Sequence, residues 1–78
     1  MILLFQIENC QYCSYVRSVL ANLNISYVAI NAAYGSPARQ MQLKFGSPDQ
    51  VPFLVDVDKG RMISESEDIV EYLSKTYA

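Results

Sequence analysis

The chain has 78 residues, of which 51% are apolar, two are cysteine and none is histidine or tryptophan. A chain of this length forms one small domain, so we predict a single domain over residues 1–78. Six Lys and Arg against eight Asp and Glu give a net charge of −2, which argues against nucleic acid or anionic lipid as a partner. The absence of histidine removes the usual general base and the commonest metal ligand.

The cellular compartment can be inferred from the apolar runs and the cysteine count. The longest apolar run, residues 1–5, is far shorter than the roughly 18 residues needed to cross a bilayer, and it has no basic flank like that of a signal peptide. Two cysteines, Cys10 and Cys13, are too few for the disulfide scaffold of a small secreted protein. We therefore expect a soluble cytoplasmic protein with no membrane partner.

The first third of the chain has the pattern of a strand, a helix and a second strand. Residues 2–7 are almost continuously apolar, as in a strand buried on both faces. Apolar residues at i, i+3, i+4 and i+7 from Val16 predict a helix over residues 11–23. Residues 25–30 are predicted to form a second strand, and a helical crossover of this length makes the two strands parallel.

A second helix is predicted where Ser36 precedes Pro37. Serine is a common N-cap because its hydroxyl accepts a hydrogen bond from a free N–H of the first turn, and proline suits the first helical position. We expect this helix to run to about Phe45. Gly46 is its expected end, because glycine readily adopts the left-handed conformation that terminates helices.

The last third of the chain is predicted to be a hairpin followed by a helix. Residues 53–57 and 61–63 are extended segments separated by a glycine-containing turn, which favours an antiparallel hairpin. Ser64 and Glu67 have the spacing of a capping box, so a last helix is expected from there to about Lys75. The complete order, βαβ-α-ββα, predicts an α/β fold with a four-stranded mixed sheet and three helices, compatible with the thioredoxin-like architecture.

The two cysteines form a C-x-x-C pair where the first strand gives way to the first helix. Free N–H groups and the positive end of the helix dipole stabilise a thiolate at Cys10, whereas Glu8 opposes it and Arg17 is the nearest cation in sequence. One helical turn brings Cys13 close to Cys10, so that a mixed disulfide on Cys10 could be resolved internally. These positions predict that Cys10 is the catalytic nucleophile and Cys13 the resolving cysteine.

Three other interpretations of the cysteine pair stay open from the sequence. A structural disulfide over so short a loop would restrain the unfolded chain little and would open under reducing conditions. A zinc site would need four ligands, and this chain offers only two thiolates and carboxylates, so no metal is predicted. Two inert cysteines in the core are the third interpretation, since free cysteine is often buried.

Three motifs in this order carry a resemblance to known families. They are C-Q-Y-C at residues 10–13 before a helix, Q-V-P-F-L at residues 50–54 before a strand, and S-E-S-E-D-I at residues 64–69 opening the last helix. The chain resembles a glutaredoxin, and it is equally similar to the N-terminal, glutathione-binding domain of glutathione transferases. The likeness covers essentially the whole chain and implies a thioredoxin-like fold.

The resemblance implies a set of glutathione contacts. It implies a cis peptide bond between Val51 and Pro52, facing the cysteines, with the Val51 backbone paired to the cysteinyl part of glutathione. It also implies that Ser66 holds the γ-glutamyl carboxylate, that Glu65 faces the ammonium group, and that Tyr12 flanks the ligand. The plain alternatives are a proline that merely starts a strand, ordinary helix caps, and a tyrosine used for packing.

The sequence departs from the glutaredoxin pattern at several positions. Gln11 stands where many dithiol glutaredoxins have proline, Ile7 where they have lysine, and Ser64-Glu65 where they often have two glycines. A cation for the glycyl carboxylate of glutathione is therefore missing near the cysteines. Arg39 and Lys44, in the second predicted helix, are the remaining candidates, although a solvated charge is the ordinary explanation for each.

The resemblance implies a glutathione-dependent thiol-disulfide oxidoreductase, a monomeric dithiol glutaredoxin. Glutathione would be its co-substrate, and its partners would be disulfide-containing or glutathionylated proteins. One alternative is a thioredoxin-like electron donor that a flavoenzyme reduces. Another is a non-catalytic module that binds glutathione or an iron–sulfur cluster.

Overall fold

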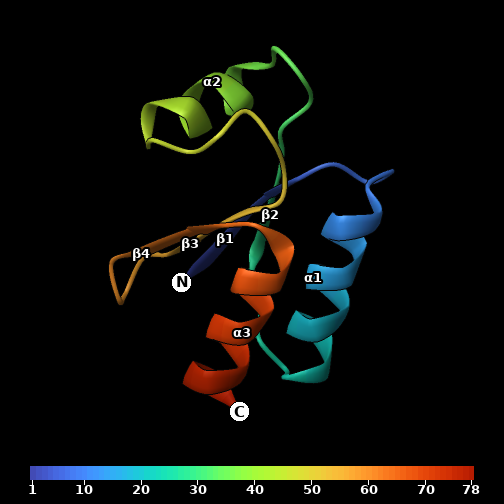
Figure 1. Ribbon diagram of the computed structural model, residues 1–78, viewed down its shortest axis with the longest axis vertical. Helices are drawn as coiled ribbons and strands as arrows, with labels where there is room; N and C mark the ends of the chain where they lie inside the picture. The colour runs from blue at the N-terminus through green and yellow to red at the C-terminus, as the bar shows by residue number, and fades with distance from the viewer.

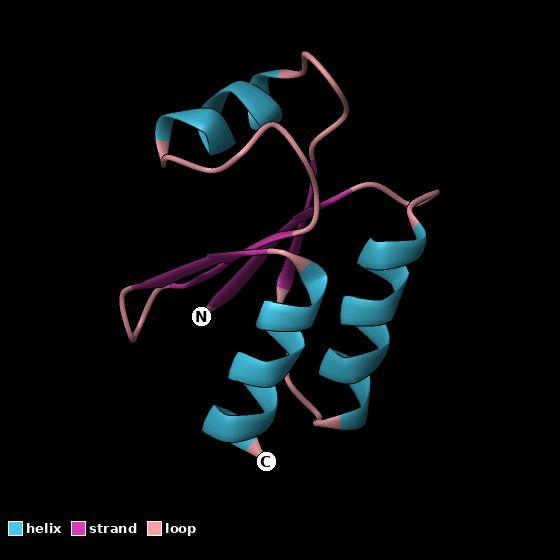
Figure 2. Cartoon of the chain, in the orientation of Figure 1, coloured by secondary structure: helices cyan, strands magenta, loops and turns pink.

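The computed structural model describes residues 1–78 and contains one sheet and three helices (Figures 1 and 2). The sheet has the strand order β2-β1-β3-β4, with β1 and β2 parallel and the other pairs antiparallel. Helices α1 and α3 lie side by side on one face of the sheet, and α2 covers the other. This arrangement confirms the predicted thioredoxin-like, four-stranded mixed sheet. The elements are β1 (Ile2–Gln6), α1 (Gln11–Asn22), β2 (Val28–Asn31), α2 (Pro37–Lys44), β3 (Phe53–Asp56), β4 (Arg61–Ser64) and α3 (Ser66–Tyr77).

The alternation of side chains along the central strands supplies a core to each face of the sheet. Phe5 and Phe53 pack with Ala32 beneath α2, and the ring of Phe45 meets Phe5 edge-on with 6.2 Å between centroids. The larger cluster lies between the sheet and the helices α1 and α3. Its buried members are Ile2, Leu4, Val16, Leu20, Leu54, Ile69 and Leu73.

The second strand begins later than predicted from residues 25–30, because the residues before it terminate α1. Asn24 adopts a left-handed conformation with φ of 57°. The N–H of Ile25 donates to Leu20 O at 2.9 Å, and the N–H of Asn24 donates to Ala21 O at 3.0 Å. These two bonds form a Schellman motif, which satisfies carbonyl groups at the helix end. The strand therefore starts only at Val28.

The predicted capping box at Ser64 and Glu67 is wrong. Ser64 is the last residue of β4 and pairs with Phe53, so it belongs to the sheet and not to the helix. The N-cap of α3 is Glu65, whose side chain makes no capping hydrogen bond and whose φ is 71°. By contrast, Ser36 caps α2 as predicted, since its Oγ accepts the N–H of Arg39 at 3.1 Å.

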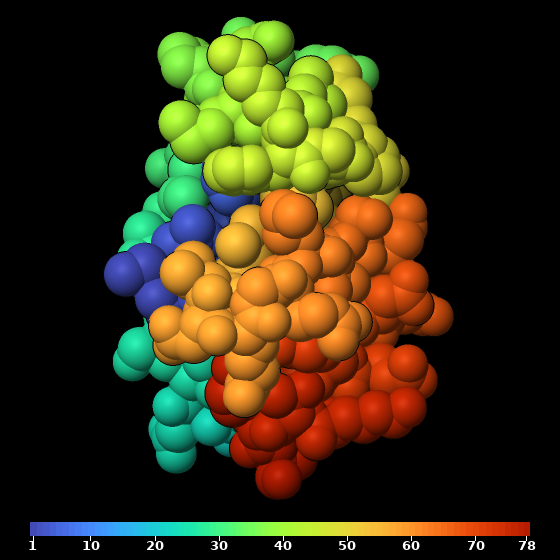
Figure 3. Space-filling view, turned by 90° about the vertical axis from the view of Figure 1, so that its left-hand side faces the viewer, coloured from blue at the N-terminus to red at the C-terminus, as the bar shows by residue number.

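The surface in Figure 3 shows how the three layers meet on one side of the molecule. Helix α2 forms the upper part, and the β3–β4 hairpin with α3 forms the lower part. None of the three helices is both long enough and apolar enough to span a membrane.

Candidate functional site

Cys10 is the N-cap residue of α1, as the sequence predicts. Its backbone is extended, with φ of −127° and ψ of 116°, and its carbonyl accepts the N–H of Ser14 at 2.9 Å. Its Sγ accepts the backbone N–H of Cys13 at 3.2 Å. Both cysteines are free thiols, and Cys10 is half-buried. The Cys10 sulfur therefore lies at the positive end of the helix dipole with an N–H donor directed at it.

Cys13 is placed very differently, one turn into the helix. It is 0% exposed in the core between α1 and the sheet. Burial, helped by the hydrogen bond with Cys10, raises the pKa of the Cys13 thiol to about 12, although the backbone of Ile7 and the charge of Arg17 oppose the rise. At neutral pH the Cys13 sulfur is a neutral thiol and a poor nucleophile.

Arg17 secures the segment that leads from β1 to the cysteines. Its guanidinium donates to Gln6 Oε1 and, at 3.4 Å in each case, to the carbonyl oxygens of Ile7 and Glu8. Gln6 is buried and its Nε2 donates to Asn31 Oδ1 at 2.7 Å, which links β1 to β2. The cation nearest to the cysteines in sequence is thus engaged with the loop, which it holds in place.

A hollow of about 600 Å³ lies beside the C-x-x-C turn. All five residues to which the resemblance assigns glutathione contacts line it. Neither cysteine lines it, but Tyr12, two positions after Cys10 and 62% exposed, does. The lining residues are Tyr12, Gln50, Val51, Pro52, Glu65, Ser66, Glu67 and Asp68.

The peptide bond between Val51 and Pro52 is cis, which confirms that part of the expected geometry. Val51 precedes β3 and its backbone N–H and C=O make no hydrogen bond within the chain. Backbone groups left free next to a sheet are suited to pairing with an extended peptide ligand. The ligand contact itself stays a prediction.

The N-terminus of α3 contributes Ser66, Glu67 and Asp68 to the lining of the hollow. The backbone N–H groups of Ser66, Glu67 and Asp68 have no acceptor in the chain, as is usual for the first turn of a helix. Such a set of donors, with the helix dipole behind it, favours an anion. Glu65, just before this turn, holds a positive φ that is rare for a residue with a side chain.

Gln50 belongs to this site, although no role was predicted for it from the sequence. It lines the hollow, and its Nε2 donates to Glu65 Oε1 at 2.8 Å, joining the segment before β3 to the start of α3. Its position directly before Val51-Pro52 was the only indication available.

Arg39 is not a solvated cation, contrary to the expectation for it. It is 4% exposed, its Nη1 pairs with Asp49 Oδ1 at 2.8 Å, and its Nε donates to Ala32 O at 3.1 Å. Its charge is already neutralised inside the protein, so it has none to offer a glycyl carboxylate. Lys44 is exposed at the end of α2, as expected for a solvated charge, and it does not line the hollow.

Comparison with known proteins places the chain within a family. The model of the family described as "Glutathione S-transferase, N-terminal domain" matches residues 4–78. Prostaglandin E synthase 2 of Mus musculus is 33% identical over 76 residues, which are 95% of this chain and 19% of that protein. The chain therefore spans about a fifth of the length of this curated relative.

Solved structures of glutathione transferases share the fold. Glutathione transferase E6 of Drosophila melanogaster has a TM-score of 0.80 and 28% identity, over 100% of this chain and 36% of that chain. The glutathione transferase URE2P8 of Phanerochaete chrysosporium, solved with oxidized glutathione, has a TM-score of 0.78 and 26% identity, over 97% and 36%. A diazinon-metabolizing glutathione S-transferase of the silkworm Bombyx mori has a TM-score of 0.84 and 24% identity, over 99% of this chain and 38% of that chain. At this identity the likeness supports the shared fold alone. The chain belongs to the family of glutathione S-transferase N-terminal domains.

Proposed function

We propose that this domain is a glutathione-dependent thiol-disulfide oxidoreductase of the dithiol glutaredoxin type. The observation that carries the proposal is the difference between its two sulfurs. The Cys10 sulfur lies at the N-cap of α1 and accepts an N–H, whereas Cys13 is fully buried and its pKa is raised to about 12. Because the thiolate is the form that attacks a disulfide, Cys10 acts as the nucleophile.

The proposed reaction begins with a mixed disulfide between glutathione and a protein or small thiol. The Cys10 thiolate attacks the glutathionyl sulfur, a Cys10–glutathione disulfide forms, and the substrate leaves as a thiolate that takes up a proton. The thiolate of a second glutathione then attacks the glutathionyl sulfur of this adduct, giving glutathione disulfide and the Cys10 thiolate. The net change converts one mixed disulfide and one glutathione thiol into one substrate thiol and one glutathione disulfide.

Cys13 offers the second way out of the adduct. Its thiol loses a proton and attacks the Cys10 sulfur, which forms an internal disulfide and releases glutathione. With a pKa of about 12 and no exposed surface, Cys13 reacts slowly in the folded state. The route through a second glutathione is therefore the faster one, and the internal disulfide forms when glutathione is scarce.

The hollow beside the cysteines is the proposed glutathione site. The free backbone groups of Val51, next to Pro52, pair with the cysteinyl part of the ligand. Ser66 and the free N–H groups of α3 meet the γ-glutamyl carboxylate, Glu65 faces the ammonium group, and Tyr12 flanks the peptide. The Phanerochaete relative, solved with oxidized glutathione, supports a glutathione disulfide as ligand.

Family membership also favours a second function, transfer of glutathione to an electrophile. In that reaction the sulfur of glutathione itself must be held as a thiolate. Here the protein supplies a sulfur nucleophile of its own, the free Cys10 thiol at the N-cap of α1, and this favours the oxidoreductase. Partner proteins with disulfide or glutathionylated cysteines, a cytoplasmic location and a monomeric state remain predictions.

The test compares wild type, Cys10→Ser and Cys13→Ser after incubation of the reduced proteins with glutathione disulfide. We expect intact-mass measurement to show a persistent glutathione adduct on Cys13→Ser and none on Cys10→Ser. Turnover of a glutathione mixed disulfide should survive in Cys13→Ser and disappear in Cys10→Ser. An adduct on Cys10→Ser, or conjugation of an aryl halide by wild type without any disulfide reduction, would contradict the proposal.

A further inference from the structure

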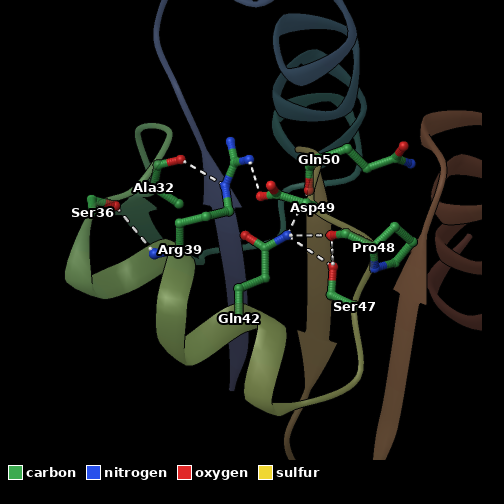
Figure 4. A network of polar contacts seen from close by, with 8 residues as sticks. All are labelled: Ala32, Ser36, Arg39, Gln42, Ser47, Pro48, Asp49 and Gln50. Atoms are coloured by element: carbon green, nitrogen blue, oxygen red, sulfur yellow. Dashed lines mark hydrogen bonds and ion pairs between the residues drawn. The ribbon is translucent and has the colours of Figure 1, made fainter.

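One buried side chain of helix α2, Gln42, forms hydrogen bonds with the segment that precedes Val51. Gln42 is 0% exposed, and its Nε2 donates to Gln50 O at 2.5 Å and to Ser47 Oγ at 2.8 Å. Pro48 O lies 3.4 Å from the same nitrogen. Figure 4 shows the side chain directed from the helix into the turn formed by residues 47–50.

The orientation of the Gln42 amide follows from its surroundings. The side chain faces two carbonyl oxygens and a hydroxyl that already donates, since Ser47 Oγ bonds to Pro48 O at 2.7 Å. An amide can satisfy such acceptors only with its NH₂ group. Its oxygen is left buried without a partner. What Gln42 supplies to the fold is therefore its pair of donor hydrogens.

The bond to Gln50 O sets the direction of the next N–H. The peptide bond between Gln50 and Val51 is trans, since the cis bond of the chain is the following one. In a trans peptide plane the C=O and the N–H point in opposite directions. Because Gln42 turns Gln50 C=O toward α2, Val51 N–H is directed away from α2, and it has no partner within the chain.

A second, separate contact keeps the turn in place. Arg39 pairs with Asp49 at 2.8 Å and reaches Ala32 O at 3.1 Å, so the turn is tied both to α2 and to the segment after β2 (Figure 4). This contact holds the side chain of Asp49 and does not touch the peptide plane before Val51. Loss of Gln42 is therefore expected to free the peptide plane while the turn stays anchored.

We propose that Gln42 is a positioning residue for glutathione, which it never touches. It holds the Gln50–Val51 peptide plane so that Val51 N–H points at the cysteinyl carbonyl of the bound tripeptide. This inference rests on the proposed function, because it takes the hollow to be a glutathione site. If it holds, part of the affinity for glutathione depends on α2, which covers the face of the sheet opposite α1 and α3.

The experiment measures the affinity of the full chain for S-methylglutathione by calorimetry, because this ligand cannot react with Cys10. We expect Gln42→Met, which keeps the length of the side chain and removes its donors, to bind about 5- to 20-fold more weakly. The rate of Cys10 alkylation by iodoacetamide, which needs no binding site, should change less than about twofold. Ile2→Val, a mild truncation in the core at a residue that does not line the hollow, controls for stability and should bind like wild type.

A second variant separates positioning from packing. Gln42→Glu has no donor when ionised and one donor when protonated. Its affinity relative to wild type should therefore rise as the pH is lowered, whereas that of Gln42→Met should stay constant. Equal binding by wild type and Gln42→Met, or equal weakening in Ile2→Val, overturns the positioning role alone. Absence of binding by wild type overturns the proposed glutathione site and this inference with it.

Discussion

The buried carboxylate of Asp56 links the sheet to α3 by two hydrogen bonds, which allow a direct test of the packing. Asp56, the last residue of β3, is 0% exposed, and its Oδ2 accepts the hydroxyls of Tyr72 and Tyr77 at 2.6 Å each. A hydrogen bond to a charged group contributes about 1.5–3 kcal/mol. We expect Tyr72→Phe to cost about 2 kcal/mol. Tyr77→Phe should cost about 1 kcal/mol, because Tyr77 is 37% exposed and water competes for its bond.

The same two hydrogen bonds predict how the free energy of unfolding depends on pH. Burial acts to raise the pKa of Asp56, but the hydroxyls of Tyr72 and Tyr77 outweigh it and hold that pKa below its usual range. A carboxyl with a lowered pKa stabilises the fold above its unfolded-state pKa near 3.9 and loses that contribution as the pH falls through the folded value. At the alkaline end, the bond to Asp56 and burial raise the pKa of Tyr77 to about 12. Its contribution is fully present below about pH 10, the unfolded-state pKa, and is lost as the pH rises from there through the folded-state pKa of about 12.

Urea denaturation of wild type, Tyr72→Phe and the double variant Tyr72→Phe/Tyr77→Phe measures both effects. Near pH 7 each removed hydroxyl should lower the free energy of unfolding, out of a total of about 4–12 kcal/mol for a chain of this size. In the double variant burial is opposed only by the backbone N–H of Lys59 and the N-terminal charge, so acid unfolding should begin at a higher pH than in wild type. If the free energy of unfolding of Tyr72→Phe lies within about 0.3 kcal/mol of that of wild type and the acid midpoint is unchanged, the proposed hydrogen bonds to an ionised Asp56 are refuted.

Three further outcomes follow from local geometry. At about pH 7.5, a pKa of about 12 leaves roughly 3 in 100,000 Cys13 thiols ionised. Iodoacetamide should therefore label only Cys10 in the folded protein. Peptide mapping that finds labelling of Cys13 in the native protein would contradict its burial. Ser36→Ala removes the side-chain cap of α2 and should lower the free energy of unfolding by about 1 kcal/mol, as measured by urea titration, while Ser36→Thr should retain most of it. Glu65→Gly should be about 1 kcal/mol more stable than Glu65→Ala, because both lose the side chain but only glycine adopts the positive φ freely; equal unfolding midpoints would exclude strain at this residue.

The position of Cys10 could be predicted because two local patterns meet there. The apolar run of β1 ends and the helical spacing from Val16 begins within a few residues, so the first cysteine had to fall near the helix start. Ser36-Pro37 located the second helix for the same reason, since capping depends on neighbours in sequence. The resemblance supplied five of the eight residues that line the hollow, and spacing alone could not have brought these five together.

Predictions failed where two local preferences competed or where a partner was distant in sequence. Ser64 has the spacing of a capping box, but pairing with Phe53 in the sheet took precedence. Arg39 looked like a surface charge because its partner Asp49 lies ten residues further on, in a turn whose course depends on packing against α2. The role proposed for Gln42 has the same origin, since no periodicity indicates which carbonyl a buried amide will meet.

The two faces of the sheet contribute separable parts of the proposed reaction. In the proposed reaction, helix α1 distinguishes the two sulfurs, because its first turn leaves Cys10 at the N-cap and carries Cys13 into the core. The free backbone of Val51 is held from the other face, through α2 and Gln42. A change at Gln42 in α2 should therefore alter the affinity for glutathione and leave thiol reactivity as it was, whereas a change at Cys13 in α1, which does not line the hollow, should do the reverse.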